Sequence, residues 1–267
     1  MDTKLFRGTA KYYSKYRAGY PKEFFDYITQ HFCLQKNGRL LDLACGTGQL
    51  TIPLARNFKE VIGLDQEQEM LDEAEIEAKK SATENVSWIL SRAEDISFEL
   101  GRFNLITIGT AFHWMERDNV LKKAYDLIED KGVLLIVSNI SDNPGSQGWT
   151  HEEDAWKEAR KKIVRKYLGE RRRAGNTLYA PSDRKFKDHL VQSQFGNCEE
   201  KVFTHTKTWN LEEVINHLYS TSYASKALLG DKITSFEADL KAELLKCEPA
   251  GIFVEHVKTQ LLISIKK

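Results

Sequence analysis

Hydrophobic residues up to about position 137 occur in short runs, and between these runs they recur at helical spacing. Short apolar runs are typical of buried strands, and helical spacing is typical of amphipathic helices. The regular alternation predicts βαβ units with five buried parallel strands. The expected strands are Leu40–Cys45, Val61–Leu64, Val86–Ser91, Leu105–Gly109 and, after a turn at Gly132, Val133–Val137.

Helices are expected on both sides of these strands. Pro21 is typical of a helix's first turn, and Glu213 stands where a capping box with Asn210 requires an acid. We therefore predict that one helix opens at Pro21 and another at Asn210. The complete set of expected helices is Lys4–Tyr16, Pro21–Phe32, Gln49–Asn57, Gln66–Lys80, Glu116–Ile128, about 150–168, one from Asn210, and Asp231–Lys246.

Two more alternating segments, Val202–Trp209 and Thr259–Ile265, bring the expected strands to seven. Parallel strands that are joined by helices wind right-handed. We therefore expect an α/β fold, a Rossmann-like doubly wound seven-stranded mostly parallel sheet with helical lid insertions and a ligand at the carboxyl ends of its strands. One domain is predicted over 1–267, with an N-terminal helical lid over 1–36 and an insertion that forms a substrate lid over 139–194.

The charge balance, the cysteine spacing and the length of the apolar runs indicate which partners and which cellular compartment to expect. Lys plus Arg and Asp plus Glu both total 39, so no overall field attracts nucleic acid. The four cysteines show no CxxC spacing, which favours reduced thiols and argues against a metal site. No apolar run approaches the ~20 residues of a membrane span. We expect a soluble cytoplasmic protein with a small-molecule substrate, no nucleic acid or membrane partner, and a monomeric or homodimeric state.

A glycine-containing turn follows the first expected strand. Ala44 stands two residues before Gly46, and Thr51 stands three residues after Gly48, where the dinucleotide-binding fingerprint would have its third glycine, so the match to that fingerprint is partial. The Asp42 carboxylate would repel a diphosphate but suits a ligand with an ammonium and a sulfonium, such as S-adenosyl-L-methionine (SAM). Asp65 ends the next strand, near the position at which an acid binds both ribose hydroxyls. Charge therefore favours SAM over NAD.

These features resemble the class I SAM-dependent methyltransferases, whose first motif is an acid before a small-residue G-x-G loop and whose second is an acid that ends the next strand. The residues that carry the resemblance are Asp42, Ala44, Gly46, Gly48 and Asp65. Arg92-Ala93-Glu94-Asp95 is similar to the adenine-contacting segment of this family, and Gly109–Trp114 to its segment after the fourth strand.

A narrower resemblance covers most of the chain. The leader Tyr12–Pro21, the triplet Phe112-His113-Trp114, and Trp209 before Leu218–Ser222 are similar to the trans-aconitate-methyltransferase-like (methyltransferase type 11) proteins. The resemblance implies SAM as the cofactor, no metal, and methylation of a small molecule. Because Arg92 stands where many relatives place an acid, the adenine contact passes to its neighbours. The implied cofactor-binding residues are Asp42, Ala44, Gly46, Gly48, Asp65, Gln66, Met70, Ala93, Glu94, Tyr16 and Arg17.

The acceptor determines whether a base is needed. A carboxylic acid with a pKa near ~4 is already ionised and needs only cations to hold it, for which Arg17 and Arg171–Arg173 are candidates. A phenol, hydroxyl or carbon acid needs a general base, and His113 is the candidate catalytic residue. The alternative, that this histidine only packs against Trp114 and forms hydrogen bonds, is favoured. The resemblance favours a carboxylate.

Three other functions stay open. RNA methylation would use the nine Lys and Arg residues of Lys157–Arg173, although Trp156, Ala159, Ile163 and Tyr167 at helical spacing predict an amphipathic helix there. A non-catalytic SAM-binding regulatory module is possible because a fold does not determine a function. A nicotinamide-dependent dehydrogenase is disfavoured by the incomplete glycine pattern and by Asp42. Trp209 and Tyr219 are candidates for a substrate pocket or for core packing.

Overall fold

The computed structural model describes residues 5–32, 36–139, 154–179 and 184–267, and its chain divides into two compact units. The sheet unit comprises 19–139, 182–204 and 258–267, and the helical unit comprises 1–18, 140–181 and 205–257. The expected organisation as one domain with two lids stays a prediction. The turn expected near Asn143–Gly148 lies outside the described residues.

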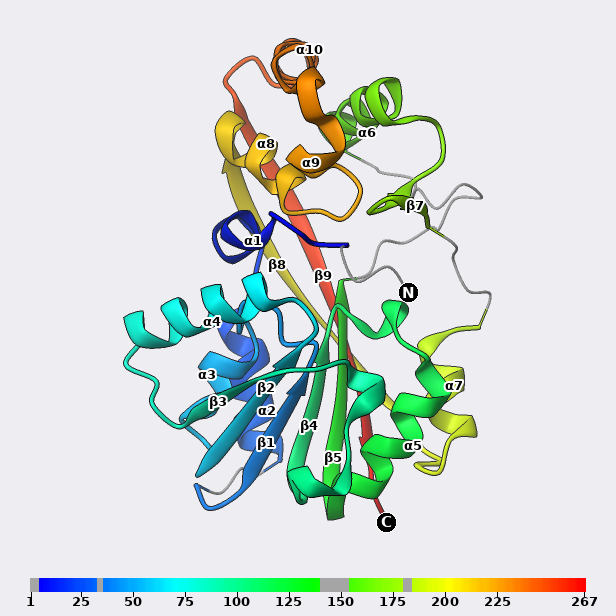
Figure 1. The fold of residues 1–267 in the computed structure, drawn as a ribbon. Coiled ribbons are helices and arrows are strands. Elements are labelled where there is room, and N and C mark those ends of the chain that lie inside the picture. The colour runs from blue at the N-terminus through cyan, green and yellow to red at the C-terminus, as the bar shows by residue number, and fades with distance from the viewer. Residues whose placement is uncertain (1–4, 33–35, 140–153, 180–183) are drawn as a thin grey trace. The chain divides into compact units, whose positions relative to one another are not determined.

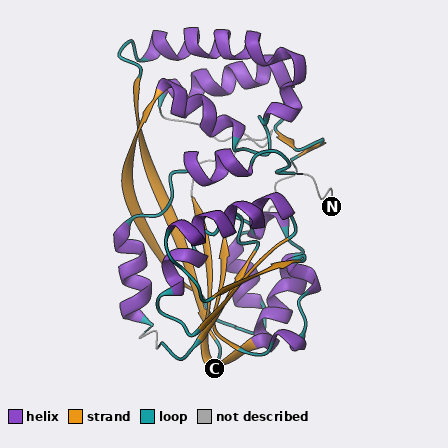
Figure 2. Cartoon of the chain, turned by 60° about the vertical axis from the view of Figure 1, so that its left-hand side comes forward, coloured by secondary structure: helices purple, strands orange, loops and turns teal. Residues whose placement is uncertain are grey.

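Seven strands form one sheet in the order β3-β2-β1-β4-β5-β9-β8 (Figure 1). Figure 2 shows the strands in orange and the helices in purple. The neighbours from β3 to β5 pair in parallel, and β9 pairs antiparallel to β5. The expected Rossmann-like, mostly parallel seven-stranded sheet is confirmed. The strands are β1 (Arg39–Leu43), β2 (Glu60–Asp65), β3 (Val86–Leu90), β4 (Phe103–Gly109), β5 (Ile128–Asn139), β8 (Glu199–Asn210) and β9 (Ile252–Ile265).

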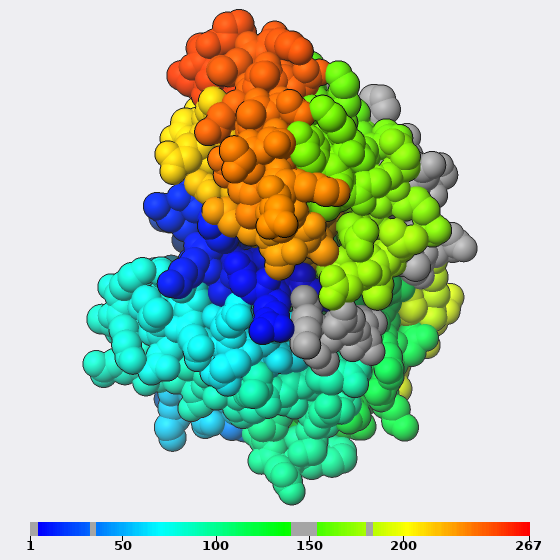
Figure 3. Space-filling model, turned by 45° about the horizontal axis from the view of Figure 1, so that its top comes forward, coloured from blue at the N-terminus to red at the C-terminus, as the bar shows by residue number. Residues whose placement is uncertain are grey.

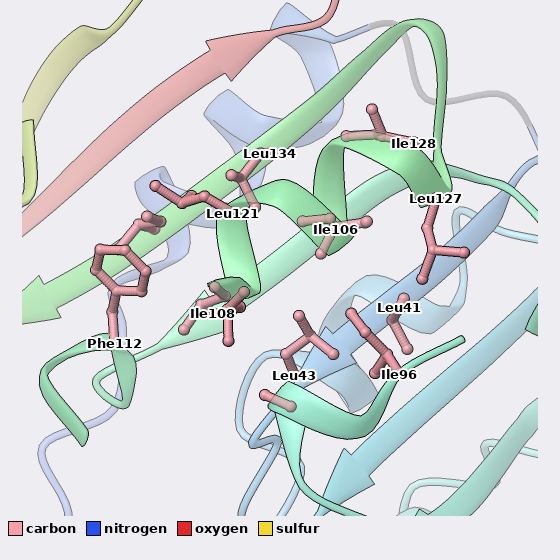
Figure 4. Close-up of a cluster of buried hydrophobic side chains, with 14 of the residues drawn as sticks. Leu41, Leu43, Ile96, Ile106, Ile108, Phe112, Leu121, Leu127, Ile128 and Leu134 are labelled. Atoms are coloured by element: carbon pink, nitrogen blue, oxygen red, sulfur yellow. The ribbon is translucent and has the colours of Figure 1, made fainter. Parts of the chain in front are cut away.

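Both faces of the central strands are buried, which explains why the sequence shows unbroken apolar runs there. Leu40 and Leu105 face α2 (Lys22–His31) and α3 (Thr51–Ala55) in one cluster. Their neighbours Leu41 and Ile106 face the opposite way, toward a cluster that includes side chains of α5 and α7 (Figure 4). α4 (Gln68–Lys80), α5 (Arg117–Leu127) and α7 (Phe186–Gln192) complete the α-helices of this unit.

The turn expected at Gly132 is wrong. β5 begins at Ile128 and runs through Gly132, while its register against β4 shifts between Phe103 and Leu105. A backbone φ of 64° at Lys131 accompanies this irregularity. A local bulge of this kind lets a strand continue through a glycine that otherwise marks a turn. A Cβ on Gly132 would stand 2.7 Å from the Glu129 carbonyl oxygen, so glycine is required there.

The helical unit contains α1 (Ala10–Tyr16), α6 (Ala155–Leu168), α8 (Leu211–Tyr219), α9 (Lys226–Leu229), α10 (Ile233–Cys247) and a hairpin of β6 (Arg173–Ala174) with β7 (Thr177–Leu178). Ile163 of α6, Leu218 of α8 and Phe236 of α10 share one buried cluster. α6 and α10 lie side by side on the face seen in Figure 3. Neither the hairpin nor α7 and α9 was expected from the sequence.

The predicted capping box at the start of α8 is confirmed. The Asn210 side-chain oxygen accepts a hydrogen bond from the Glu213 backbone N–H (2.9 Å), and the Glu213 carboxylate accepts one from the Asn210 backbone N–H (2.8 Å). The first helix is shorter than expected and begins only at Ala10. Within the described residues, every helix is too short or too polar to cross a lipid bilayer.

Candidate functional site

Residues 44–48, called the glycine loop below, connect β1 to α3. The backbone φ angle is positive at Ala44 (53°), Gly46 (55°) and Gly48 (82°). The positive φ at Gly48 favours glycine there, and a Cβ would also stand 2.8 Å from Ile52 Cδ1, so that side chain would have to shift. The Gly48 carbonyl accepts the Ile52 N–H at 3.0 Å as the chain enters α3. The loop thus reverses tightly at the carboxyl end of β1.

Asp42 lies beneath the glycine loop and is 1% exposed. Its carboxylate accepts hydrogen bonds from the hydroxyls of Thr51 (2.5 Å) and Thr107 (2.7 Å), and so ties β1 to α3 and to β4. Burial raises the pKa of Asp42 to about 6, the two hydroxyls act to lower it, and the charge of Asp65 raises it further. Asp42 is therefore an anchor for the loop, and its contact with a cofactor stays a prediction.

Asp65 ends β2 and joins it to the glycine loop. One carboxylate oxygen accepts the Gly46 N–H at 2.8 Å and the other accepts the Glu67 N–H at 2.9 Å. Burial raises the pKa of Asp65, while bonds from the backbone N–H groups of Glu67, Gly46 and Gln66 act to lower it. Each carboxylate oxygen retains a further lone pair. Asp65 can therefore also accept hydrogen bonds from a ribose.

Thr47 contributes a buried hydroxyl group to the glycine loop. It is 2% exposed, and its hydroxyl oxygen is buried without a hydrogen-bond partner among the described residues. Burying a hydroxyl without a hydrogen bond costs ~1–3 kcal/mol. A polar ligand at the glycine loop would remove that cost, so the residues present fit a bound nucleoside cofactor. Thr47 was not among the cofactor-binding residues predicted from the sequence, although its position between Gly46 and Gly48 could have indicated it.

The adenine-contacting segment follows β3 as a short 3₁₀ turn, Ala93–Asp95. The Glu94 carboxylate accepts the Glu116 backbone N–H at the start of α5 (3.0 Å) and pairs with Arg92 (3.3 Å). This pairing explains why an arginine is accommodated where relatives carry an acid. Ala93 is 6% exposed. The adenine contacts of Ala93 and Glu94 stay predictions, and the Glu94 side chain already has a structural role.

Two further predicted cofactor residues lie just after Asp65. Gln66 is partly exposed in the turn between β2 and α4. Met70 is 3% exposed on the first turn of α4, and its backbone N–H donates to the Glu67 carbonyl at 3.0 Å. The structure therefore places both beside the end of β2, and their contacts with SAM stay predictions.

His113 lies in a 3₁₀ turn after β4, Phe112–Trp114. Its partly exposed ring has its centroid 4.5 Å from the centroid of the Trp114 ring. The His113 carbonyl accepts a hydrogen bond from Arg117 at 3.3 Å. The contact with Trp114 agrees with the packing interpretation, and a role for His113 as general base stays a prediction.

Tyr16 and Arg17 belong to the helical unit. Tyr16 stacks on Tyr12 with 6.4 Å between ring centroids, and Arg17 donates to the Ser220 carbonyl at 2.8 Å. Their cofactor contacts stay predictions. Tyr20, in contrast, lies in the sheet unit, where its hydroxyl is 3.2 Å from the place of a Cβ on Gly109 at the carboxyl end of β4. Tyr20 belongs to the Tyr-rich leader that the sequence singles out, but it was not among the residues predicted to bind the cofactor.

The basic stretch of α6 is amphipathic, as expected. Trp156 and Ile163 are buried, while Lys161 pairs with Glu158 and Lys162 pairs with Glu243. Lys157, Arg165 and Lys166 also contact acids.

The two candidate pocket aromatics lie in the core of the helical unit. Trp209 is 2% exposed and donates to Glu255 at 2.8 Å, and Tyr219 is 1% exposed and donates to Glu237 at 2.7 Å. Both therefore match the core-packing interpretation. No group of three or more His, Cys, Asp or Glu residues that could hold a metal ion occurs among the described residues.

The four predicted segments come together along one edge of the sheet. They follow β3, β2, β1 and β4, which are neighbours in that order. The Asp65 carbonyl also accepts the N–H of Ser91 at 2.9 Å, just before the adenine-contacting segment. β1 and β4 flank the point where the strand order reverses, and ligands of open α/β sheets bind there.

Comparisons with known proteins agree with this arrangement. The family described as "Methyltransferase domain" matches residues 40–132, which include all four segments. A protein of Dictyostelium discoideum that is named as a methyltransferase is 29% identical over 244 residues, 90% of this chain and 85% of that protein.

Solved structures share the fold. A Bacillus halodurans protein that is named as a methyltransferase is 20% identical with a TM-score of 0.55, over 91% of this chain and 99% of that one. An N-methyltransferase of Haemonchus contortus, solved with S-adenosylhomocysteine, is 15% identical with a TM-score of 0.52, over 92% of this chain and 52% of that one. The narrower trans-aconitate-methyltransferase-like assignment stays a prediction. The matched domain, the likeness along most of the chain and the order of the four segments on one sheet edge support the identification of the chain as a class I SAM-dependent methyltransferase.

Proposed function

We propose that this methyltransferase binds SAM at the glycine loop and transfers its methyl group to a small-molecule carboxylate by in-line displacement. The observation that carries the proposal is the bond from the Gly46 N–H to Asp65 (2.8 Å), because it joins the loop to the acid that would bind the ribose. The buried hydroxyl of Thr47, which lacks a partner among the described residues, adds a polar group for the cofactor. The S-adenosylhomocysteine in the Haemonchus contortus relative supports the same choice.

The residues of the site have separable roles in this proposal. Asp65 accepts hydrogen bonds from the ribose hydroxyls, and Asp42 contributes negative potential beneath the loop that favours a cationic cofactor. Gly46 and Gly48 let the cofactor approach the backbone closely. Ala93, Gln66 and Met70 hold the nucleoside end.

A carboxylate acceptor fits the residues that follow β4. SAM would supply an electrophilic methyl group, and displacement by a carboxylate oxygen requires no proton transfer. The chain then needs to align the acceptor and exclude water, which are effects of positioning. This requirement agrees with a His113 ring that packs against Trp114. A small-molecule partner is also favoured over RNA, because five of the cations on α6 already contact acids.

We also infer a cytoplasmic location and activity as a monomer or homodimer. The support for the location is that Cys45, Cys198 and Cys247 are free thiols, which suits a reducing compartment. Burial raises the pKa of the Cys45 thiol well above its usual value. Cys45 is therefore an unreactive packing residue of the loop.

Thermal melting with SAM, S-adenosylhomocysteine, NAD and buffer tests the cofactor. A ligand at about a hundred times its Kd stabilises by ~2.7 kcal/mol, so we expect a shift with the first two ligands only. Asp65→Ala is expected to abolish the shift. Asp72→Asn, on the exposed side of α4, is the matched control and is expected to retain it. If neither SAM nor S-adenosylhomocysteine shifts the wild-type melting temperature, the proposed cofactor site is wrong.

Transfer of a radiolabelled methyl group from SAM to a panel of small carboxylic acids tests the reaction. The expected product is a methyl ester, identified by mass spectrometry and by its alkaline hydrolysis. A chain that binds SAM but methylates no member of a broad panel of acids, phenols, amines and RNA would support the regulatory module instead.

A further inference from the structure

Four basic side chains of the helical unit converge near the end of α8. Arg17 directly follows α1, Lys157 and Arg160 lie on α6, and His217 lies on the last turn of α8. We call these four residues the basic cluster. Their places in the sequence span some 200 residues, so only the fold brings them together.

Arg17 uses little of its hydrogen-bonding capacity. One terminal nitrogen donates to the Ser220 carbonyl at 2.8 Å, and the guanidinium lies 4.5 Å from the centroid of the Tyr13 ring. Its Nε atom is buried and has no hydrogen-bond partner among the described residues. A guanidinium carries five N–H donors and favours planar, bidentate contacts with carboxylates. The hydrogen bond to Ser220 at the end of α8 therefore uses only part of the hydrogen-bonding capacity of the Arg17 guanidinium.

Arg160 has an unusual partner for an arginine. Its terminal nitrogen contacts Nδ1 of His217 at 3.2 Å, and its guanidinium lies 5.3 Å from the Trp156 ring centroid. A guanidinium only donates hydrogen bonds, so Nδ1 must be the acceptor and the proton of the neutral ring lies on Nε2. Burial, followed by the charges of Arg160, Arg17 and Lys157, lowers the pKa of His217 well below its usual value. At neutral pH the ring therefore adds a further N–H donor.

The two carboxylates that contact the basic cluster, those of Asp154 and Glu255, both pair with Lys157. Asp154 contacts Lys157 at 3.1 Å, and Glu255 contacts Lys157 at 3.5 Å while it accepts the Trp209 indole N–H. In the described part of the chain, no acid contacts Arg17 or Arg160. A cation that is withdrawn from water without a partner is costly. The cluster therefore offers positive charge and N–H donors, and no carboxylate among the described residues pairs with Arg17 or Arg160.

We propose that the basic cluster binds the carboxylate of the methyl acceptor, through Arg17, Arg160 and the Nε2–H of His217. This inference rests on the proposed function and assigns the recognition of the acceptor to the helical unit. A carboxylate is the chemical match, because its two oxygens accept several charge-assisted hydrogen bonds and it supplies the missing negative charge. The methionine carboxylate of SAM has the same chemistry, and the experiment must separate the two sources.

Isothermal titration with succinate as the probe and succinamide as its neutral counterpart tests the cluster. We expect succinate to bind the wild-type chain and succinamide not to bind. Arg17→Gln and Arg160→Gln should each weaken succinate binding about tenfold or more, since each removes a charge-assisted contact. Lys162→Gln is the matched control on α6, because that lysine is exposed and pairs with Glu243. Its affinity for succinate should stay within about twofold of the wild type.

Parallel titrations with S-adenosylhomocysteine separate this inference from the proposed function. We expect its affinity to be unchanged in Arg160→Gln. If S-adenosylhomocysteine binds but neither succinate nor the longer glutarate and citrate bind, the inference is overturned and the proposed cofactor site stands. If the substitution weakens S-adenosylhomocysteine instead, the cluster serves the cofactor and the inference is also overturned. Succinate binding without any S-adenosylhomocysteine binding would show that the cluster binds a carboxylate, but would refute the proposed function and with it the assignment of that carboxylate to a methyl acceptor.

The wild-type chain provides a readout that does not depend on how the variants fold. Succinate should shift the imidazole nitrogen resonances of His217 in a long-range ¹H–¹⁵N spectrum, and succinamide should leave them in place. A His217 ring that does not respond to saturating succinate, glutarate or citrate would overturn the inference. Arg160→Lys, which retains the charge but loses the planar fork, should give an affinity between those of the wild type and Arg160→Gln.

Discussion

The Thr107 hydroxyl on β4 donates a 2.7 Å hydrogen bond to the Asp42 carboxylate on β1. These strands are neighbours at the point where the strand order reverses. Thr51 donates to the other carboxylate oxygen at 2.5 Å, so α3 is held by the same acid. A buried carboxyl group with two hydroxyl donors therefore supports the glycine loop, and its protonation affects the stability of the fold.

Asp42 makes the stability of the chain depend on pH. Its pKa rises from 3.8 to about 6 on folding, so between these values the folded chain holds a proton that the unfolded chain has lost. The free energy of unfolding therefore falls as the pH rises through this window, by ~3 kcal/mol for this group. Asp42→Asn should lack this contribution. Urea unfolding of both proteins from pH 3.5 to 7 measures the difference, which must grow in favour of the variant as the pH rises.

Thr107→Val provides the control for this effect. Removing one hydroxyl donor should raise the pKa of Asp42 further, because that hydrogen bond favours the ionised form. The pH window in which stability falls should then extend above pH 6. Parallel unfolding curves for Asp42→Asn and the wild type over the whole range would show that Asp42 does not titrate as described.

Gly63 is required by the ring of Trp88. The two residues are paired on β2 and β3, and a Cβ on Gly63 would stand 2.4 Å from the ring. We expect Gly63→Ala to destabilise the fold by about 1–3 kcal/mol through overpacking. In Trp88→Leu the same alanine should cost much less. A double-mutant cycle measured by urea unfolding should show this coupling, and strictly additive effects would contradict the proposed clash.

The strands could be predicted because their side chains are buried on both faces. Leu40 and Leu41 point to opposite hydrophobic clusters. Because both faces of the strand are buried, successive residues are apolar and the strand appears as an unbroken apolar run in the sequence. The positions of Asp42 and Asp65 followed from the same logic, since residues at or near the ends of adjacent parallel strands share one sheet edge. The local signal at Asn210 sufficed for its capping box because both partners lie on one helical turn.

Contacts between distant residues could not be predicted from local patterns. Glu94 was expected at the adenine, but its carboxylate caps α5 through Glu116, 22 positions further along the chain. The pairing of Arg160 with His217 depends on how α6 and α8 are held in the shared cluster of the helical unit, which the periodicity of neither helix predicts. The hairpin of β6 and β7 has two residues in each strand, too few to produce a recognisable alternation.

The capping box at α8 should contribute measurably to stability. Asn210→Ala removes the acceptor for the Glu213 N–H and is expected to cost ~1 kcal/mol in urea unfolding. Glu212→Ala is the matched control, because it removes an acid from the same turn without touching the box. Its expected cost is only a few tenths of a kcal/mol, through the helix dipole. Equal losses from the two substitutions would show that charge, and not the capping geometry, stabilises this helix end.

Thr47 should separate stability from cofactor binding. Its buried hydroxyl has no hydrogen-bond partner among the described residues, so Thr47→Val, which preserves the shape, should leave the ligand-free chain equally stable or ~1 kcal/mol more stable. The same substitution should weaken S-adenosylhomocysteine about fivefold or more, because the cofactor loses a hydrogen-bond partner.

Thr51→Val is the matched control, because the Thr51 hydroxyl is buried and donates to Asp42. It should destabilise the ligand-free chain, since it removes a bond that is already made in the absence of a ligand. Urea unfolding and isothermal titration of the two variants give both quantities. If Thr47→Val destabilises the ligand-free chain as much as Thr51→Val does, the Thr47 hydroxyl already has a hydrogen-bond partner in the absence of a ligand. That result would contradict the proposal that this hydroxyl binds the cofactor.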